Sequence, residues 1–283
     1  MPWMQKIDEY FNGRASFIFD DEDMTITGTT TVTASGTAHT KGSWSQVVAS
    51  APYDIGMLWL YSADNNASNT DTGQLLDIGI GAASSEQVLV PDILSGYSTL
   101  AAAYGMFIPI FIPEGTRISA RIQAAVSSDT LVLKMGYFEA GGYPTYQYCE
   151  NLGSNTSTSG GTDVEGGSWI ELKASTDLPL DAFVAMADLG AATLGGDRAT
   201  NNIGIGAAAS EVQIYPPIND SGTAQTDGWI VASGSQEDIT DLFPRGILPG
   251  IRRVPSGTRV AIQQPTGDRC DGAALLGFGG AVH

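Results

Sequence analysis

Two short glycine motifs come closest to the spacing of a known ligand site. They read GIGAAS at residues 79–84 and GIGAAA at residues 204–209, and they approximate the fingerprint that binds a dinucleotide at the start of a helix. Each motif is followed by a strand-like run that ends at a proline, Pro91 or Pro216, and not by the helix that such a site requires. The glycines are therefore expected to serve a turn or a close approach between strands, and no cofactor is predicted.

Residues for catalysis and metal binding are sparse. The only histidines are His39 and His283, so neither a histidine metal cage nor a Ser-His-Asp set can be assembled from the sequence. The acidic runs at residues 20–23 and 64–71 lack the ligand spacing of a calcium loop. A glycosidase-like carboxylate pair stays open, because 31 acidic residues offer pairs in any fold, but no spacing singles one out. The sequence predicts no catalytic residue, no metal site and no enzyme.

The net charge of the chain indicates which kinds of partner it is suited to bind. Lys and Arg number 13 and Asp and Glu number 31, so 13 − 31 gives a formal net charge of −18. Such a chain is not suited to neutralise nucleic-acid phosphates or to bind an anionic membrane. We expect no secretory signal and no membrane span. Cys149 and Cys270 lack the spacing of a zinc or redox motif and are predicted to be free thiols in a reducing cytoplasm, with a single disulfide as the alternative.

An internal repeat is the strongest pattern in the chain. Residues 77–86 (DIGIGAASSE) and residues 202–211 (NIGIGAAASE) are identical at eight of ten positions, with an offset of 202 − 77 = 125. The triplet Gly-Ser-Trp at residues 42–44 recurs at residues 167–169 with the same offset, since 167 − 42 = 125. Self-similarity of this kind indicates duplicated structural units.

A third anchor sets the limits of the two units. Residues 112–118 (IPEGTRI) match residues 254–260 (VPSGTRV) with an offset of 254 − 112 = 142, so the second copy holds 142 − 125 = 17 additional residues before this anchor. The period is too long for a solenoid, which indicates tandem domains. We expect a first domain over residues 29–140, a Gly, Ser and Thr-rich linker over 141–162, and a second domain with a longer internal loop over 163–283.

Each copy also keeps one acidic and one basic residue at matching places. Glu86 with Arg117 in the first copy corresponds to Glu211 with Arg259 in the second. This predicts a structural ion pair that is repeated in both domains, although unrelated exposed charges are the alternative. An exposed pair would contribute only about 0 to 1 kcal/mol.

Short apolar runs bounded by turn residues predict strands. In residues 117–123, Ile118, Ala120 and Ile122 alternate with polar residues that include Ser119, so one face should meet a core and the other solvent. Eight such runs fall in the first copy: 24–34, 44–50, 55–61, 75–80, 87–90, 107–112, 116–123 and 131–138. We therefore predict an all-β protein of two tandem jelly-roll-like β-sandwich domains.

The amino-terminal residues 1–28 are expected to form a short arm. Trp3, Ile7 and Phe11 recur at i, i+4 and i+8 and could line one face of a short helix. Because so short a helix is scarcely stable alone, it should dock either on its own domain or on a neighbouring subunit, as an assembly arm. Both alternatives remain open.

Three segments of the first copy carry a family resemblance: HTKGSW (residues 39–44), LLDIGIGAASSE (75–86) and IPEGTRISAR (112–121). They resemble a domain of tailed-bacteriophage virion structural proteins, and the likeness covers most of both copies. The second copy departs from it where Gln263 stands in place of Arg121.

The resemblance implies a non-enzymatic virion structural protein, a capsid decoration or cement protein on the outside of the head shell. Its partners would be the major capsid protein and copies of itself, since a homotrimer would present six similar lobes. Assembly would take place in the host cytoplasm. A tail, neck or fibre-base component and a host-glycan-binding module are the alternatives.

Overall fold

Strands form all the regular structure that the computed structural model describes. The described residues are 24–64, 73–95, 103–141, 145–164, 167–188, 200–214, 218–219, 230–233, 253–264 and 272–282. The strands are β1 (Met24–Ile26), β2 (Thr30–Thr33), β3 (Ser45–Val48), β4 (Ile55–Asp64), β5 (Gln74–Ile80), β6 (Gln87–Ser95), β7 (Ala103–Ile108), β8 (Ile118–Ala124), β9 (Thr130–Glu139), β10 (Thr145–Leu152), β11 (Trp169–Lys173), β12 (Ala182–Asp188), β13 (Thr200–Ile205), β14 (Val212–Gln213), β15 (Ile218–Asn219), β16 (Ile230–Ser233), β17 (Val260–Gln263) and β18 (Gly272–Val282). Within these ranges there is no helix that could cross a membrane.

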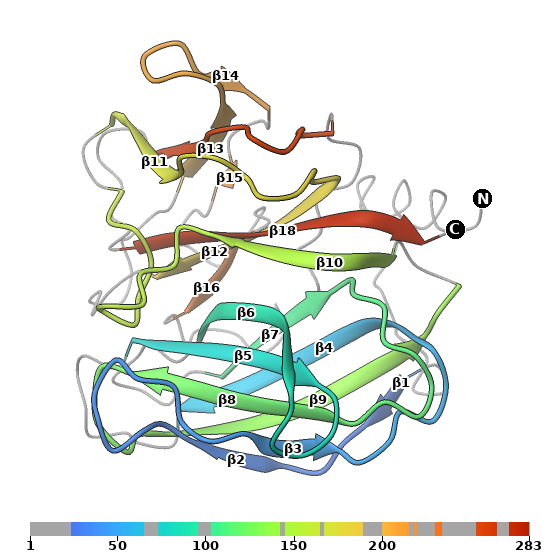
Figure 1. Cartoon of the computed structure of the whole chain (residues 1–283). Helices are drawn as coiled ribbons and strands as arrows, with labels where there is room; N and C mark the ends of the chain where they lie inside the picture. The colour runs from blue at the N-terminus through green and yellow to red at the C-terminus, as the bar shows by residue number, and fades with distance from the viewer. Residues whose placement is uncertain are drawn as a thin grey trace.

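The first unit is a sandwich of two sheets (Figure 1). One sheet has the order β1-β9-β4-β7, with β2 also paired to β9, and the other has the order β3-β8-β5-β6. If β2 is counted as the first strand and β9 as the eighth, one sheet has the order first-eighth-third-sixth. The other sheet has the order second-seventh-fourth-fifth. This is the strand order of a jelly roll.

The second unit repeats this arrangement. Its sheets have the orders β10-β18-β12-β16 and β11-β17-β13-β14, with β15 also paired to β13. One pairing differs, because β12 and β16 run parallel whereas β4 and β7 run antiparallel. The predicted fold class of two tandem jelly-roll β-sandwiches is confirmed.

The sheet β10-β18-β12-β16 is buried on both faces. Along β18, Ala274, Leu276 and Phe278 belong to the core cluster of the first unit, whereas Ala273 and Leu275 belong to the core of the second. All five side chains are fully buried. Because successive strand residues point to opposite faces, this sheet lies between the first unit and the other sheet of its own sandwich.

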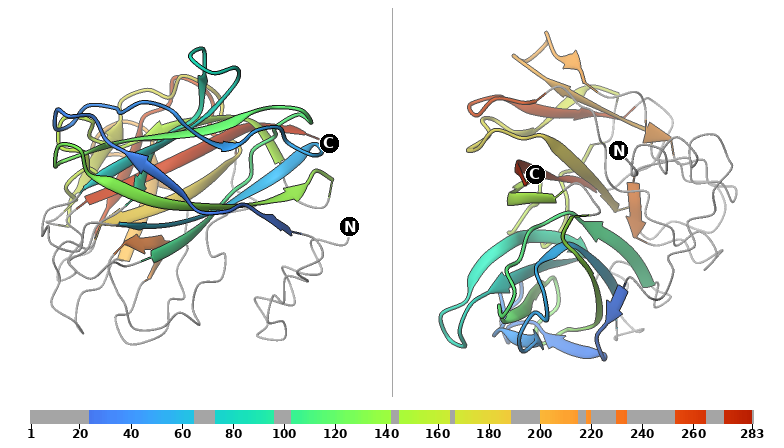
Figure 2. Two further views of the ribbon diagram at one scale, coloured as in Figure 1. Left: turned by 90° about the horizontal axis from the view of Figure 1, so that it is seen from below. Right: turned by 90° about the vertical axis from the view of Figure 1, so that its right-hand side faces the viewer.

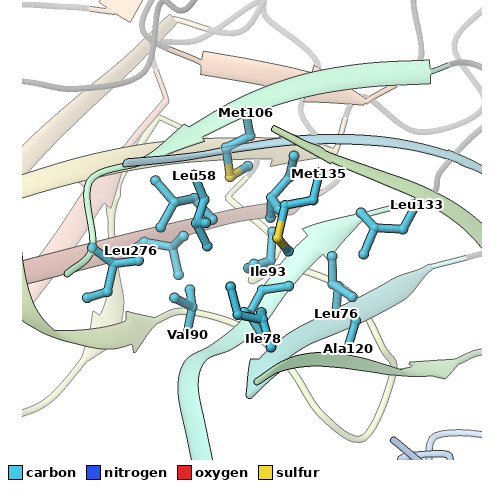
Figure 3. Packing of buried hydrophobic residues seen from close by; sticks show 14 of the residues in the cluster. Leu58, Leu76, Ile78, Val90, Ile93, Met106, Ala120, Leu133, Met135 and Leu276 are labelled. Carbon is cyan, nitrogen blue, oxygen red and sulfur yellow. The ribbon is translucent and has the colours of Figure 1, made fainter. Parts of the chain in front are cut away.

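The first sandwich is closed by this sheet along one side. Its end strands β6 and β7 contact β10, β12 and β16, and the two units stack on one another (Figures 1 and 2). Leu276 accordingly lies among first-unit side chains such as Leu58 and Met135 (Figure 3). A fully buried Leu or Phe contributes about 1.5–3 kcal/mol, so the two units share a core and are not beads on a flexible linker.

Two segments differ from the sequence expectation at the unit boundaries. Residues 145–152 of the expected linker form β10, which pairs with β18 along its whole length because Tyr146 and Leu152 are buried. The Gly, Ser and Thr-rich composition that indicated a linker belongs to the loop after β10. Residues 24–26 of the expected arm form β1 and pair with β9.

β6 also differs, because it continues through Pro91 and does not stop there. Pro91 is tolerated since β6 is an end strand, where a missing N–H costs no ladder hydrogen bond. The pairing of β6 with β5 shifts register at this point, and Asp92 adopts a positive φ of 47°. The irregularity turns the Asp92 side chain and carbonyl toward the neighbouring elements described below.

Ser119 does not face solvent as the alternation predicted, but is fully buried. Its cross-strand neighbour on β5 is Gly79, and a Cβ placed on Gly79 would lie 2.5 Å from the Trp44 ring. Trp44 therefore covers this part of the outer sheet face. In the second unit Trp169 lies over Gly204 in the same way, with the nearest approach at 2.6 Å.

Candidate functional site

An ion pair closes the β5–β6 hairpin of the first unit. Arg117 Nη1 lies 2.6 Å from Glu86 Oε1 and also donates to the carbonyl of Gly81 at 3.4 Å. Arg117 Nε donates to Gln46 Oε1 at 3.0 Å, so one guanidinium joins three segments of the chain. The hydrogen bond from Arg117 lowers the pKa of the Glu86 carboxyl below its usual value.

The second unit contains the same constellation. Arg259 Nη1 lies 2.8 Å from Glu211 Oε1 and donates to the carbonyl of Gly206 at 3.2 Å, while Arg259 Nε donates to Glu171 Oε2 at 2.7 Å. Burial tends to raise the pKa of Glu211, but hydrogen bonds from the backbone and from Arg259 hold it below the usual value. The structure thus brings together each of the two sequence-predicted pairs, at equivalent places in the two folds.

The glycine motifs form the turns of these hairpins. Gly81 and Gly206 have φ values of 114° and 112°, a region that glycine adopts without strain. Strands β6 and β14 follow the turns, where a dinucleotide site would need a helix. The geometry of the motifs is therefore that of a hairpin turn beneath a tryptophan.

A charged cluster surrounds Asp77 on β5 of the first unit. The buried carboxylate of Asp77 accepts a hydrogen bond from Lys41 Nζ at 2.6 Å and from Arg121 Nε at 2.8 Å. Lys41 also lies 2.6 Å from Asp92, and the guanidinium of Arg121 stacks 4.4 Å above the Trp44 ring. Two cations thus compensate two carboxylates, which buried charges require.

Neutral amides occupy the corresponding place in the second unit. Asn202 stands where Asp77 stands in the first copy, and its Nδ2 donates to Gln263 Oε1 at 3.2 Å. Gln213 Nε2 donates to Asn202 Oδ1 at 3.1 Å. The side chain at this position is therefore hydrogen-bonded in both copies, by charged groups in the first copy and by neutral amides in the second.

The charged cluster borders the junction between the units. Asp92 N donates to Asp77 Oδ1 at 2.9 Å, and the Asp92 carbonyl accepts hydrogen bonds from Asn151 Nδ2 and Ser154 Oγ of the second unit, both at 2.9 Å. Leu94 N donates to Met186 Sδ at 3.3 Å across the same junction. The cluster thus stabilises the bulge of the edge strand β6, where the second unit contacts the first.

A loop of the second unit docks on the first beside this point. Ser159 Oγ is 3.0 Å from His39 Nδ1 and accepts from Gln123 Nε2 at 3.1 Å, while the same amide nitrogen donates to the carbonyl of Thr156 at 2.6 Å. Ser159 is fully buried and has a positive φ of 58°. Sequence reasoning missed this contact because His39 and Ser159 are far apart in the chain.

The His39–Ser159 pair does not form a nucleophile site. A serine nucleophile needs a base that a third group orients and a path for the substrate, but Ser159 is sealed from solvent and receives the Gln123 amide hydrogen on the same oxygen. Among the described residues, no carboxylate forms a hydrogen bond or ion pair with His39. The pair is a contact between units.

Other sequence candidates can be placed only in part. Trp3, Ile7 and Phe11 of the expected arm lie outside the described residues, as do Cys270 and His283. Cys149 is a free thiol, and burial raises its pKa well above the usual value, which disfavours the reactive thiolate form. Among the described residues no group of three His, Cys, Asp or Glu side chains could hold a metal ion.

An apolar patch covers the outer face of the sheet β1-β9-β4-β7. Met57, Phe107 and Phe138 are buried and Trp59 packs against them. Tyr61 continues the patch, with its ring centroid 5.7 Å from that of Trp59. Of these five side chains, only those of Trp59 and Tyr61 remain partly exposed.

Comparison with known proteins gives only distant structural likenesses. No protein-family model matches the chain, and no curated protein matches it. Among solved structures, the major capsid protein of Sulfolobus turreted icosahedral virus is 10% identical with a TM-score of 0.36, over 91% of this chain and 97% of that chain. The same virus particle contains a chain that is 9% identical with a TM-score of 0.36, over 90% of each chain. N-glycanase F is 11% identical with a TM-score of 0.37, over 91% and 96%. These likenesses are too weak to assign a function.

Proposed function

We propose that this chain is a non-enzymatic structural protein of a bacteriophage virion, and more narrowly a decoration (cement) protein on the outside of the head shell. The observation that carries the proposal is the two-unit block with a shared core. The sheet β10-β18-β12-β16 is buried on both faces, so the chain holds two similar lobes in one fixed relation.

A rigid pair of lobes suits a protein that bridges neighbouring shell subunits. Each lobe offers a related surface, so the pair can meet two similar positions of a repeating lattice at once. The bridging requires no moving part and no reactive group. The ionic and amide networks of the described residues serve internal contacts, which supports a scaffold and not a catalyst.

The net charge supports an exterior position. With a formal charge of −18 the chain would be repelled by packaged nucleic acid. The partly exposed rings of Trp59 and Tyr61 on the outer sheet face suit contact with other protein chains, the major capsid protein or further copies of this one.

Imaging and heating of the virus particle test the proposal. Electron cryo-microscopy of virions should reveal the two-lobed density at regular positions of the capsid lattice. Particles that lack the chain should release their DNA at lower temperature than wild-type particles do. Density confined to the tail, neck or fibre base would refute the cement role while keeping a virion role, and absence from purified particles would refute both.

A host-glycan-binding module is the second candidate, because Trp59 and Tyr61 present adjacent, partly exposed rings that could stack on a sugar. A glycan array with the purified chain tests it. Binding that the substitution Trp59→Ala abolishes would favour this candidate, whereas no binding to any glycan would exclude it.

A further inference from the structure

The interior of the first sandwich contains a buried carboxylate that no cation of the described residues compensates. Asp129 directly precedes β9 and is only 2% exposed. Leu131 and Leu133 follow it at alternate positions and belong to the core, so Asp129 also points inward. Its carboxylate accepts hydrogen bonds from Gln74 Nε2 at 2.7 Å and from the backbone N–H of Thr130 at 2.9 Å. Both of these donors are neutral.

Two further buried oxygens near this carboxylate form no hydrogen bond within the described part of the chain. One is Oε1 of Gln74, which is fully buried on β5. The other is Oγ of Ser95, the cross-strand neighbour of Gln74 on β6. Both side chains share the face of Leu76 and Ile93, which point into the core (Figure 3). Opposite residues of antiparallel strands have Cβ atoms about 4.5–5.5 Å apart, so Ser95, Gln74 and Asp129 form one buried polar group, the Asp129 cluster.

The Asp129 cluster departs from the way in which this chain compensates other buried carboxylates. Buried charges are paired with an opposite charge or coordinate a metal ion, and buried polar atoms are hydrogen-bonded. Asp77 and Glu150 are buried as well, and each forms an ion pair with a lysine, Lys41 and Lys173 respectively. A cation beside Asp129 would bring this carboxylate under the same rule and would also give the unpartnered oxygens a partner.

The donor atoms of the cluster are those that a hard cation prefers. A carboxylate, an amide carbonyl and a hydroxyl all offer oxygen, and Ca²⁺ takes six to eight oxygen ligands in a flexible geometry, water and backbone carbonyls included. The Gln74 amide places its nitrogen beside the Asp129 carboxylate, where an N–H stands in for a positive charge. Half a turn of this amide would present Oε1 to an ion at the same place.

We propose that the Asp129 cluster binds a calcium ion, with Asp129 as the acidic ligand and Gln74 Oε1 and Ser95 Oγ as neutral ligands. The ion neutralises the buried charge and joins β5, β6 and β9 at one end of the first sandwich. Because a single ligand is acidic, we expect weak binding, with a dissociation constant of about 10⁻⁴–10⁻³ M. The acidic runs of the sequence did not indicate this site, since its other ligands are neutral strand residues. The inference goes beyond the proposed structural role and does not depend on it.

Calcium binding to the full-length chain, first stripped of metal with a chelator, tests the proposal. Equilibrium dialysis with radiolabelled calcium, in about 0.15 M NaCl to screen the surface carboxylates, should detect one saturable ion per chain. Calcium at about ten to a hundred times the dissociation constant should raise the melting temperature by about 3–8 °C. Asp129→Asn should lose both effects. Asp177→Asn, which alters a carboxylate that is 77% exposed in the second unit, is the matched control and should keep both.

Two further variants distinguish a metal ligand from a merely structural side chain. Gln74→Glu adds a second carboxylate, so in chelator it should melt at a lower temperature than the wild type. The same variant should bind calcium at least about tenfold more tightly, and added calcium should restore its melting temperature. Ser95→Ala should keep the fold and weaken calcium binding severalfold, because it removes one neutral ligand.

Three outcomes would each overturn the proposal. The first is a wild-type chain that binds no saturable calcium ion, the result expected if a proton or a water molecule completes the cluster. The second is a calcium response that Asp129→Asn retains, which would assign the binding to surface carboxylates. The third is a Gln74→Glu variant that is destabilised in chelator and that calcium does not restabilise, since Gln74 would then be a structural residue and not a ligand.

Discussion

Truncation of Leu276 should loosen both units at once, although the residue belongs to the second. Leu276 is fully buried and lies in the cluster that includes Leu58 and Met106 of the first unit (Figure 3). Removing buried Leu atoms costs about 2–5 kcal/mol in transfer and cavity terms. At about 1.4 kcal/mol per factor of ten, the lower limit corresponds to roughly 30-fold faster amide exchange where opening exposes this interface. Native-state hydrogen exchange with mass spectrometry can measure this for β6 and β7.

Leu275 supplies a matched control on the same strand. It is equally buried, but it packs in the core of the second unit. Leu275→Ala should cost a similar amount in the second unit and change the exchange of β6 and β7 much less than Leu276→Ala does. If the two variants had the same effect on those first-unit strands, or Leu276→Ala had none there, the shared core would be refuted.

Two further predictions concern the repeated hairpins. Gly79→Ala should destabilise the chain by about 1–3 kcal/mol, because the new Cβ would lie 2.5 Å from the Trp44 ring, whereas Gly36→Ala has open space and should not; thermal melting of both variants decides this. Glu86 has a lowered pKa through its bond to Arg117, so its contribution to stability is present above about pH 4.5 and is lost as the pH falls through the folded-state pKa. Urea titrations should therefore show wild type and Glu86→Gln converging in stability as the pH drops below 4.5, and a difference that stays constant with pH would contradict the assignment.

The strand pattern of the first unit could be predicted because it is local. Seven of the eight runs expected from alternation and turn residues largely coincide with a strand or a pair of strands, whereas the run 107–112 shares only residues 107 and 108 with β7. The repeated pair Glu86–Arg117 was also accessible, since duplication supplies a second observation of the same contact. Both predictions rest on information within one unit.

The junction between the units was not accessible in the same way. Apolar residues on both faces of β18 indicate burial on both sides, but they do not identify what covers each face. The expected linker failed for a related reason: the Gly and Ser-rich residues 153–161 are a docking loop, whose Ser159 is held by Gln123 of the first unit. A Gly and Ser-rich composition indicates only that a segment has no hydrophobic core of its own. It therefore fits a flexible linker and a loop that binds another domain equally well.

The duplication separates what the fold requires from what each copy contacts. The tryptophan over glycine and the Arg–Glu pair occur in both units, so they are features of the sandwich itself. The charges around Asp77 occur in one unit, beside the strand β6 that the other unit contacts. In the second copy, Gly166 and Pro217 stand in place of Lys41 and Asp92. A feature that occurs in only one copy is therefore explained by the other unit that this copy contacts.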